Sequence, residues 1–242
     1  MVFGMIISSL SSVASTIGSV VGSIGSSLSS FATSVAPVIG RVIEAVKPMA
    51  GFISQFANIF LQAMNILKPE EKVEDLGERA LQAADEGITS DGFENFSDYL
   101  DALRNFDLDE EASAQRNPVV KLVAGLGVGS AGLEQRFNAQ QGSLGSIWVL
   151  PITNPAYFTP ERMQHLVEAG RLGGNILAYL ENRLSGGDAR AFEKKLEFTA
   201  DGKAMDDGEL GSLYGALDSA QGKWAELAKQ LDQRDASRQG DA

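Results

Sequence analysis

The stretch that decides the fold is LSSVASTIGSVVGSIGSSLSSFATSV, residues 10–35. It contains no charged side chain, and bulky apolar residues recur along it at steps of three and four. The same spacing continues to Leu67, and five successive steps take 18 residues, which is the 3.6-residue period of an α-helix. Pro37 and Pro48 remove backbone donors and favour kinks or breaks. The pattern therefore predicts either a long kinked helix or a helical hairpin.

A second row along this stretch consists of small residues spaced by four. Small residues in one row let two helix backbones approach closely, which strengthens packing where water supplies no driving force. The pattern is similar in kind to that of glycine-zipper pore formers, over about 20 residues. We expect the row to be a helix-packing and oligomerisation surface between copies of the chain: Ala14, Gly18, Gly22, Ser26, Ser30 and Ser34.

The charge is divided unevenly along the chain. Residues 1–67 contain only Arg41, Glu44 and Lys47 as charged groups, a net of +1. The whole chain carries −12, so the other 175 residues carry −13. Such a division indicates two different solvents, or a partner for one part. We expect residues 1–67 to be an apolar helical membrane or oligomerisation segment.

The second uncharged run also has the length of a membrane segment. Residues 49–67 would form a helix of roughly 28 Å, close to the ~30 Å hydrocarbon core of a bilayer. The run contains amides such as Asn58 and Gln62, which can bond between helices. We expect a lipid bilayer as partner, contacted by these residues: Ile17, Val20, Val21, Ile24, Leu28, Phe31, Phe52, Phe56 and Phe60.

The composition argues against several classes of function. An acidic chain without a Lys/Arg cluster is not expected to bind nucleic acid directly through its phosphates. The absence of cysteine removes disulfides and thiolate chemistry, and the single histidine, His165, rules out a multi-histidine metal site within one chain. No nucleophile and base stand out together, so we expect no enzyme activity, catalytic residue, metal or cofactor. No basic residue precedes Arg41, so we expect no cleavable signal peptide.

The remainder, residues 68–232, is predicted to be an acidic soluble helical domain, followed by a disordered tail at 233–242. Helices are expected over 76–86, over a stretch capped by Thr89 or Ser90, over 118–133, over 160–184, from a cap at Asp188 to about Phe198, and from Asp207. Residues 107–115 are predicted to be a solvated loop, and 138–158 an ordered extended segment.

Three further patterns have structural interpretations. The glycines at 125, 127 and 129 lack the spacing of a phosphate loop and predict close helix packing. The acids Asp201, Asp206, Asp207 and Glu209 fail the spacing of a calcium loop and predict a capped turn. His165 is expected on the surface.

The sequence thus favours a mainly α protein that forms an oligomeric helical pore or conduit in a membrane. A phage DNA-ejection protein inside the virion and a secreted pore-forming effector are two settings for such a protein, and other virion or secretion-apparatus proteins would be partners. The alternative is a soluble structural component of a tail, portal or secretion tube, whose N-terminal helix lines or plugs that tube.

Overall fold

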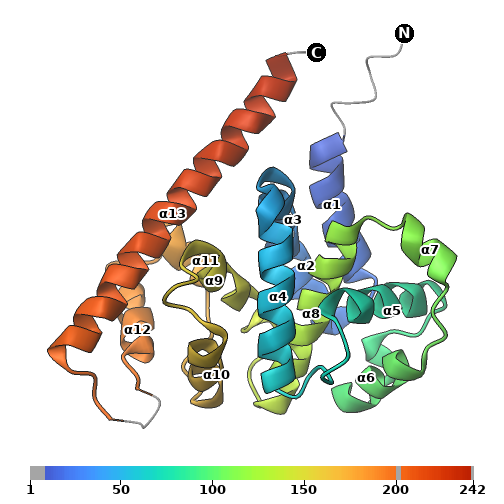
Figure 1. The fold of residues 1–242 in the computed structure, drawn as a ribbon, viewed down its shortest axis with the longest axis horizontal. Coiled ribbons are helices and arrows are strands. Elements are labelled where there is room, and N and C mark those ends of the chain that lie inside the picture. The colour runs from blue at the N-terminus through green and yellow to red at the C-terminus, as the bar shows by residue number, and fades with distance from the viewer. Residues whose placement is uncertain (1–8, 200–202, 241–242) are drawn as a thin grey trace. The chain divides into compact units, whose positions relative to one another are not determined.

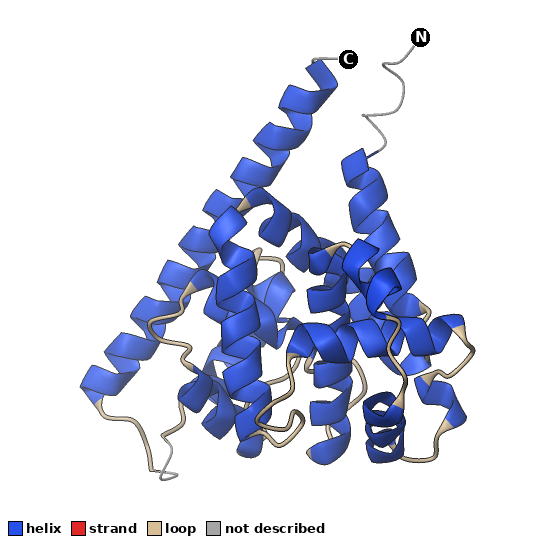
Figure 2. Ribbon diagram, turned by 45° about the vertical axis from the view of Figure 1, so that its right-hand side comes forward, coloured by secondary structure: helices blue, strands red, loops and turns tan. Residues whose placement is uncertain are grey.

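The computed structural model describes residues 9–199 and 203–240, and every regular element within them is a helix (Figure 2). The mainly α class is therefore confirmed. The elements are α1 (Ser9–Gly22), η2 (Ser26–Leu28), α2 (Ser29–Ser34), α3 (Ala36–Ala45), α4 (Lys47–Ala63), α5 (Val73–Asp85), η3 (Ser90–Gly92), α6 (Phe96–Asn105), α7 (Glu110–Gln115), α8 (Pro118–Arg136), η4 (Gly145–Trp148), α9 (Val149–Thr153), α10 (Pro160–Glu168), α11 (Ile176–Leu180), α12 (Gly186–Leu196) and α13 (Asp207–Gly240).

The chain forms two compact units. Unit 1 comprises Met1–Gly145 and Leu231–Ala242, and unit 2 comprises Ser146–Gln230. The change of composition at Lys68 lies inside unit 1, where α5 and α8 pack directly against the helices that precede this residue.

The charge-free N-terminal stretch is not one continuous helix. α1 ends at Gly22, and the chain turns through Gly25, whose φ of 145° lies in the region that favours glycine. A Cβ at Gly25 would lie 2.1 Å from the hydroxyl oxygen of Ser90, so the turn also requires glycine for space. The next breaks, at Val35 and Val46, each lie two residues before a proline, Pro37 and Pro48 respectively. α1 packs against both α2 and α3.

α8 is the central helix of unit 1 and lies between α4 and α5 in the view of Figure 1. Its glycines are the points where neighbouring helices come closest. A Cβ at Gly127 would lie 2.9 Å from the ring of Phe31, and one at Gly129 would lie 2.7 Å from a methyl group of Leu61. The prediction of close helix packing in this glycine-rich stretch is confirmed.

The closest approach of all is between α5 and α8. A Cβ at Gly77 would lie 2.0 Å from the carbonyl oxygen of Lys121, and one at Gly125 would lie 1.9 Å from the carbonyl oxygen of Val73. The two backbones therefore touch, and both contact points require glycine. Unit 1 uses in its own interior the kind of small-residue contact that membrane helices use between one another.

The prediction of a loop over residues 107–115 is wrong, because the stretch contains α7. The Asp109 side chain accepts hydrogen bonds from the backbone N–H groups of Glu111 and Ala112, and so caps this helix. Gln82 of α5 exchanges two hydrogen bonds with the backbone of Asp109, at 2.9 and 3.0 Å. Acids in a first turn stabilise a helix through its dipole, so a charged run is compatible with a short capped helix.

In unit 2, the helix predicted over 160–184 ends at Glu168. Thr159 caps its first turn, as predicted. Gly170 and Gly174 then adopt positive φ values of 64° and 97°, which turn the chain before α11 begins. Apolar residues continue at helical spacing across this turn, so the sequence pattern does not indicate that the helix ends there.

Other stretches are more helical than the sequence predicts. Residues 138–158 contain η4 and α9, and all of α9 is buried. α12 is capped by Ser185 rather than by Asp188. α13 includes residues 233–240, for which we predicted disorder; Gln, Arg and Ala in this stretch are good or neutral helix formers and extend the helix.

Candidate functional site

The residues predicted to contact a membrane lie mostly in the interior of the protein. Val20 and Phe52 are partly exposed. In the structure, the apolar stripe is therefore covered by protein, and contact with lipid would require α1, α2 and α4 to leave their packing. The remaining side chains are at most 5% exposed: Ile17, Val21, Ile24, Leu28, Phe31, Phe56 and Phe60.

Within the row of small residues, Gly18 packs α1 tightly against the next helix of the same chain, and the later members lie at the surface. A Cβ at Gly18 would lie 2.8 Å from the carbonyl oxygen of Ala32, so α1 and α2 are in backbone contact there. A Cβ at Gly22 would lie at an ordinary 3.7 Å from the Cβ of Ala32. Further along the row, Ser26, Ser30 and Ser34 are exposed. The Ala14 side chain lies outside the described residues.

Hydrogen bonds tie the turn between α1 and α2 to the turn at 90–92, and we call this cluster, made of Ser26, Ser27, Ser90 and Asp91, the N-terminal latch. The Asp91 carboxylate accepts from the backbone N–H of Ser26 at 2.9 and 3.0 Å and from its hydroxyl at 2.6 Å. The hydroxyl oxygens of Ser27 and Ser90 lie 2.6 Å apart. The backbone N–H of Ser90 donates to the carbonyl of Ile24 at 3.0 Å. The turn between α1 and α2 is thus fastened to the turn at 90–92.

A second loop reaches the same turn. The Gln141 side chain donates to the carbonyl of Ser26 at 2.9 Å. This loop is held in turn by Glu134, whose carboxylate accepts from the backbone N–H groups of Gly142 and Leu144, both at 2.8 Å. Glu134 is only 4% exposed; burial raises the pKa of its carboxyl group, and the two N–H groups lower it.

The outward face of α1 and α2 carries hydroxyl groups and no charge. Several hydroxyls donate to a carbonyl three or four residues back: Ser23 to Val20, Ser29 to Ser26, and Thr33 to Ser29. Because these hydroxyl groups already donate to carbonyls nearby in the chain, a neutral partner can cover this face without leaving them without an acceptor. The exposed residues from 16 to 34 are Thr16, Ser19, Gly22, Ser23, Ser26, Ser29, Ser30, Thr33 and Ser34.

The remaining candidates have structural roles or lie at the surface. His165 is exposed, as predicted. Asp206 and Glu209 form the predicted capped turn, since each carboxylate accepts from the backbone N–H of the other residue, at 2.8 and 2.9 Å. Asp201 lies outside the described residues. Within the described ranges, no group of three His, Asp or Glu side chains is placed to hold a metal ion.

The latch residues carry no local signal in the sequence. Asp91 is 65 residues from Ser26, and Gln141 is 115 residues from it. Each partner lies in a short polar turn that resembles any other surface turn. Only the packing of α1 and α2 over α8 brings these turns together.

Two general findings frame any functional conclusion. Among the helices of residues 9–199 and 203–240, none is both long enough and apolar enough to cross a bilayer. Comparison of the chain with protein-family models, with curated proteins and with solved structures found no match.

Proposed function

We propose that this chain is a membrane-active helical protein that stores its charge-free helices in unit 1 and releases them into a target bilayer, where several copies form a pore or conduit. The observation that supports this most is that the uncharged helices α1 and α2 bury their apolar stripe in unit 1, while the turn between them is held by the hydrogen bonds of the N-terminal latch. Delivery of phage DNA from the virion and attack by a secreted effector are two settings that require such storage.

The energetics favour storage in water and permit exchange with lipid. Burying one large apolar side chain stabilises the folded state by roughly 1.5–3 kcal/mol relative to leaving that side chain exposed to water. Exposing the seven buried stripe residues to water would therefore cost roughly 10–20 kcal/mol, as much as a typical domain's whole stability of about 5–15 kcal/mol. Lipid tails are as apolar as a protein core, so this penalty largely disappears in a bilayer. What remains are the hydrogen bonds that hold the segment, among them those of the latch and of Asn58 and Gln62 on α4, at about 1 kcal/mol each.

In the released state, the segment 1–67 would form the long kinked helix or hairpin that its continuous stripe describes. The row from Gly18 to Ser34 would then be free to pack against other copies. Arg41 and Lys47 have long apolar stems that can hold their charges at the interface. Residues 68–232 would remain outside the bilayer and position the inserted segment.

The absence of cysteine allows a direct test of release. Ser27→Cys with Ser90→Cys places two sulfur atoms where hydroxyl oxygens now lie 2.6 Å apart, so oxidation should form a disulfide that locks the latch. We expect wild type and the reduced double variant to float with phospholipid vesicles and release an entrapped dye. The oxidised variant should lose at least about tenfold in dye release, because a tethered turn cannot leave unit 1.

Each single-cysteine variant under the same oxidising conditions is the matched control, and a reductant should restore the locked protein. If wild type neither binds vesicles nor releases dye, the membrane function is wrong. If the oxidised double variant is as active as the reduced one, the function stands but release through this turn is wrong. Copurification in fixed stoichiometry with a particle, without lipid binding, would favour the structural alternative.

A further inference from the structure

Unit 2 contains an open pocket of about 700 Å³, and none of its lining residues belongs to the N-terminal helices. Its walls come from the start of α10 with the residues before it, from the chain after α12, and from the start of α13. The volume is in the range of pockets that bind small molecules. Polar groups line it together with the apolar side chains Leu166, Phe198 and Met205.

Arg162 is the principal cation of this pocket, and Tyr157 holds it in place. Its guanidinium lies over the Tyr157 ring, 4.2 Å from the ring centre, and its Nη1 donates to the Tyr157 hydroxyl oxygen at 3.2 Å. Among the described residues, no carboxylate lies within the 4.0 Å of an ion pair with Arg162. The guanidinium therefore keeps further N–H donors available. His165, one turn along α10, adds another ring donor on the same wall.

Three carboxylates, those of Glu161, Asp206 and Glu209, line the same pocket, and among the described residues none forms an ion pair with Arg162. Glu209 accepts from the backbone N–H of Asp206 at 2.9 Å, which fixes it at the start of α13. Arg162 and Glu209 both act on the Tyr157 hydroxyl. Burial raises the pKa of Tyr157, Arg162 lowers it, and Glu209 raises it. Opposite charges that share a pocket would normally form an ion pair. Here Arg162 contacts Tyr157 instead, and Glu209 accepts its capping hydrogen bond, so the two charges do not pair.

We propose that this pocket binds a small zwitterion that carries a phosphate group and an ammonium group. Arg162 and His165 offer three or more donors, which suits a phosphate better than a carboxylate. A phosphomonoester presents three terminal oxygens, and the phosphodiester of a lipid presents two with its ester oxygens beside them, whereas a carboxylate has only two oxygens in all. The Glu209 carboxylate accepts the ammonium. A ligand with both charges satisfies both walls at once, whereas inorganic phosphate would leave Glu209 as a repelling neighbour.

This chemistry has two sources, a free phosphorylated amino alcohol and the headgroup of a zwitterionic phospholipid. The pocket lies wholly in unit 2, so the proposal does not depend on membrane activity of the N-terminal helices. Binding of a soluble headgroup can be measured without any vesicle.

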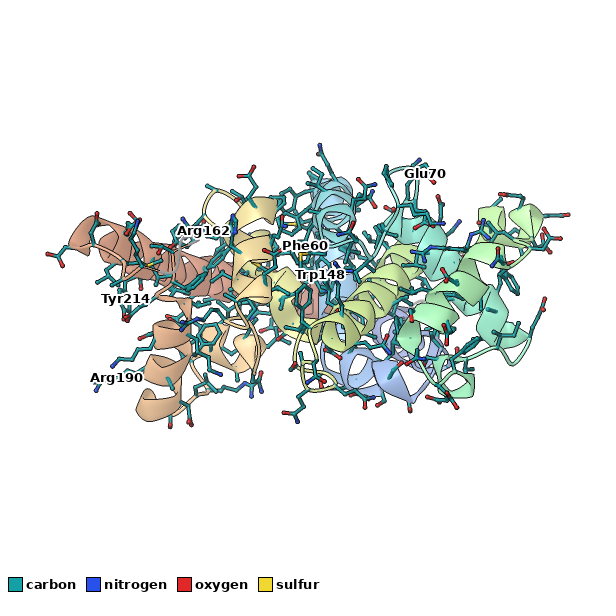
Figure 3. All side chains as sticks on the ribbon, turned by 90° about the horizontal axis from the view of Figure 1, so that it is seen from below. Phe60, Glu70, Trp148, Arg162, Arg190 and Tyr214 are labelled. Atoms are coloured by element: carbon teal, nitrogen blue, oxygen red, sulfur yellow. The ribbon has the colours of Figure 1, made fainter. Side chains whose placement is uncertain are left out.

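The test is a calorimetric titration of the full chain with phosphoethanolamine, alongside inorganic phosphate and ethanolamine alone. We expect phosphoethanolamine to bind at least about tenfold more tightly than either part. Arg162→Gln should weaken binding about tenfold or more, since it removes a charge-assisted contact. The matched control is Arg190→Gln, an exposed arginine on α12 outside the pocket lining, which should leave binding unchanged (Figure 3).

Glu209→Gln provides a second and independent readout. Glutamine can keep the capping hydrogen bond while losing the charge, so the variant should fold normally. We expect it to bind phosphoethanolamine no more tightly than inorganic phosphate. The proposal is overturned if wild type shows no binding up to roughly 10 mM ligand, or if inorganic phosphate binds as tightly as phosphoethanolamine. It is also overturned if Arg162→Gln and Arg190→Gln behave alike.

Vesicles then distinguish the two sources. Flotation is measured with phosphatidylethanolamine vesicles for wild type and Arg162→Gln, each carrying the oxidised cysteine pair so that the N-terminal helices stay locked. Loss of flotation in Arg162→Gln assigns the lipid headgroup as ligand. Flotation that does not depend on Arg162, together with binding of soluble phosphoethanolamine, assigns the free zwitterion.

Discussion

Asn58 and Gln62 are polar amides on the apolar helix α4, and each bonds to the chain that follows this helix. Asn58 accepts from the backbone N–H of Val73, the first residue of α5, at 2.7 Å. Gln62 donates to the carbonyls of Pro69 and Glu71 at 3.0 and 3.2 Å. The first N–H groups of a helix have no partner within it, so a side chain from a neighbouring helix stabilises that end. The two amides therefore fix the connection between α4 and α5.

The buried carboxyl group of Glu134 should make the stability of the protein depend on pH. An acid whose pKa is raised in the folded state binds its proton more tightly when folded than when unfolded. Its contribution to stability is therefore largest below the ordinary value of 4.5, and is lost as the pH rises through the raised pKa. Glu134→Gln does not titrate and leaves one backbone N–H facing an amide group. We expect it to lower the free energy of unfolding by about 1–2 kcal/mol at pH 7, and by more at about pH 5.

Urea unfolding followed by circular dichroism at the two pH values measures this difference. The exposed Glu94→Gln is the matched control and should change the free energy of unfolding little at either pH. A difference between wild type and Glu134→Gln that shrinks on acidification would show that the buried carboxylate is not the group responsible.

At the scale of elements, the contact between α5 and α8 is the least tolerant of change. A Cβ at Gly125 would meet backbone atoms that cannot rotate away, so Gly125→Ala must push the two helices apart. We expect a loss of about 3 kcal/mol in the free energy of unfolding. Gly132→Ala, on the same helix, would meet only side-chain atoms of Ile66 and Phe96 at 3.3–3.5 Å, and we expect a change within about 1 kcal/mol.

Thermal or urea unfolding of the two variants checks this contrast. Equal losses would mean that α5 and α8 can separate freely, and that the backbone contact does not set the position of the central helix. The pair also removes helix propensity as an explanation, because both changes replace a helical glycine by alanine.

The elements that could be predicted are those with strong local signals. Asn117 and Pro118 start α8, and Thr159 with Pro160 starts α10, because capping and the fixed φ of proline act within one turn. α7 was missed because its cap, Asp109, stands in an acidic run that looks like solvated loop. The end of α10 was missed because apolar residues continue at helical spacing past Gly170 and Gly174, whose positive φ values turn the chain there.

At the scale of the whole molecule, residues 9–67 are part of the core rather than an appendage. The side chains of Leu28, Phe31, Leu61 and Ile66 cover the glycines of α8. A truncation to residues 68–242 should therefore expose α8 to water. We expect it to bind a hydrophobic dye and to lose cooperative thermal unfolding in unit 1, with the full chain as reference. A truncated protein that unfolds cooperatively and binds no dye would contradict this view of the core.

The sequence by itself determined the helical class, the side chains that avoid water, and the breaks at the two prolines. These properties follow from periodicity and backbone chemistry, which act over one or two turns of helix. Tertiary structure alone decided what covers the apolar stripe and where the N-terminal latch closes. A stripe states only that its side chains avoid water, and a protein interior satisfies that requirement as well as lipid does. In this structure, the stripe is covered by protein because residues far away in the sequence contact the N-terminal helices. Among them are Asp91, Gly127 and Gln141, and no local sequence pattern links these residues to the stripe.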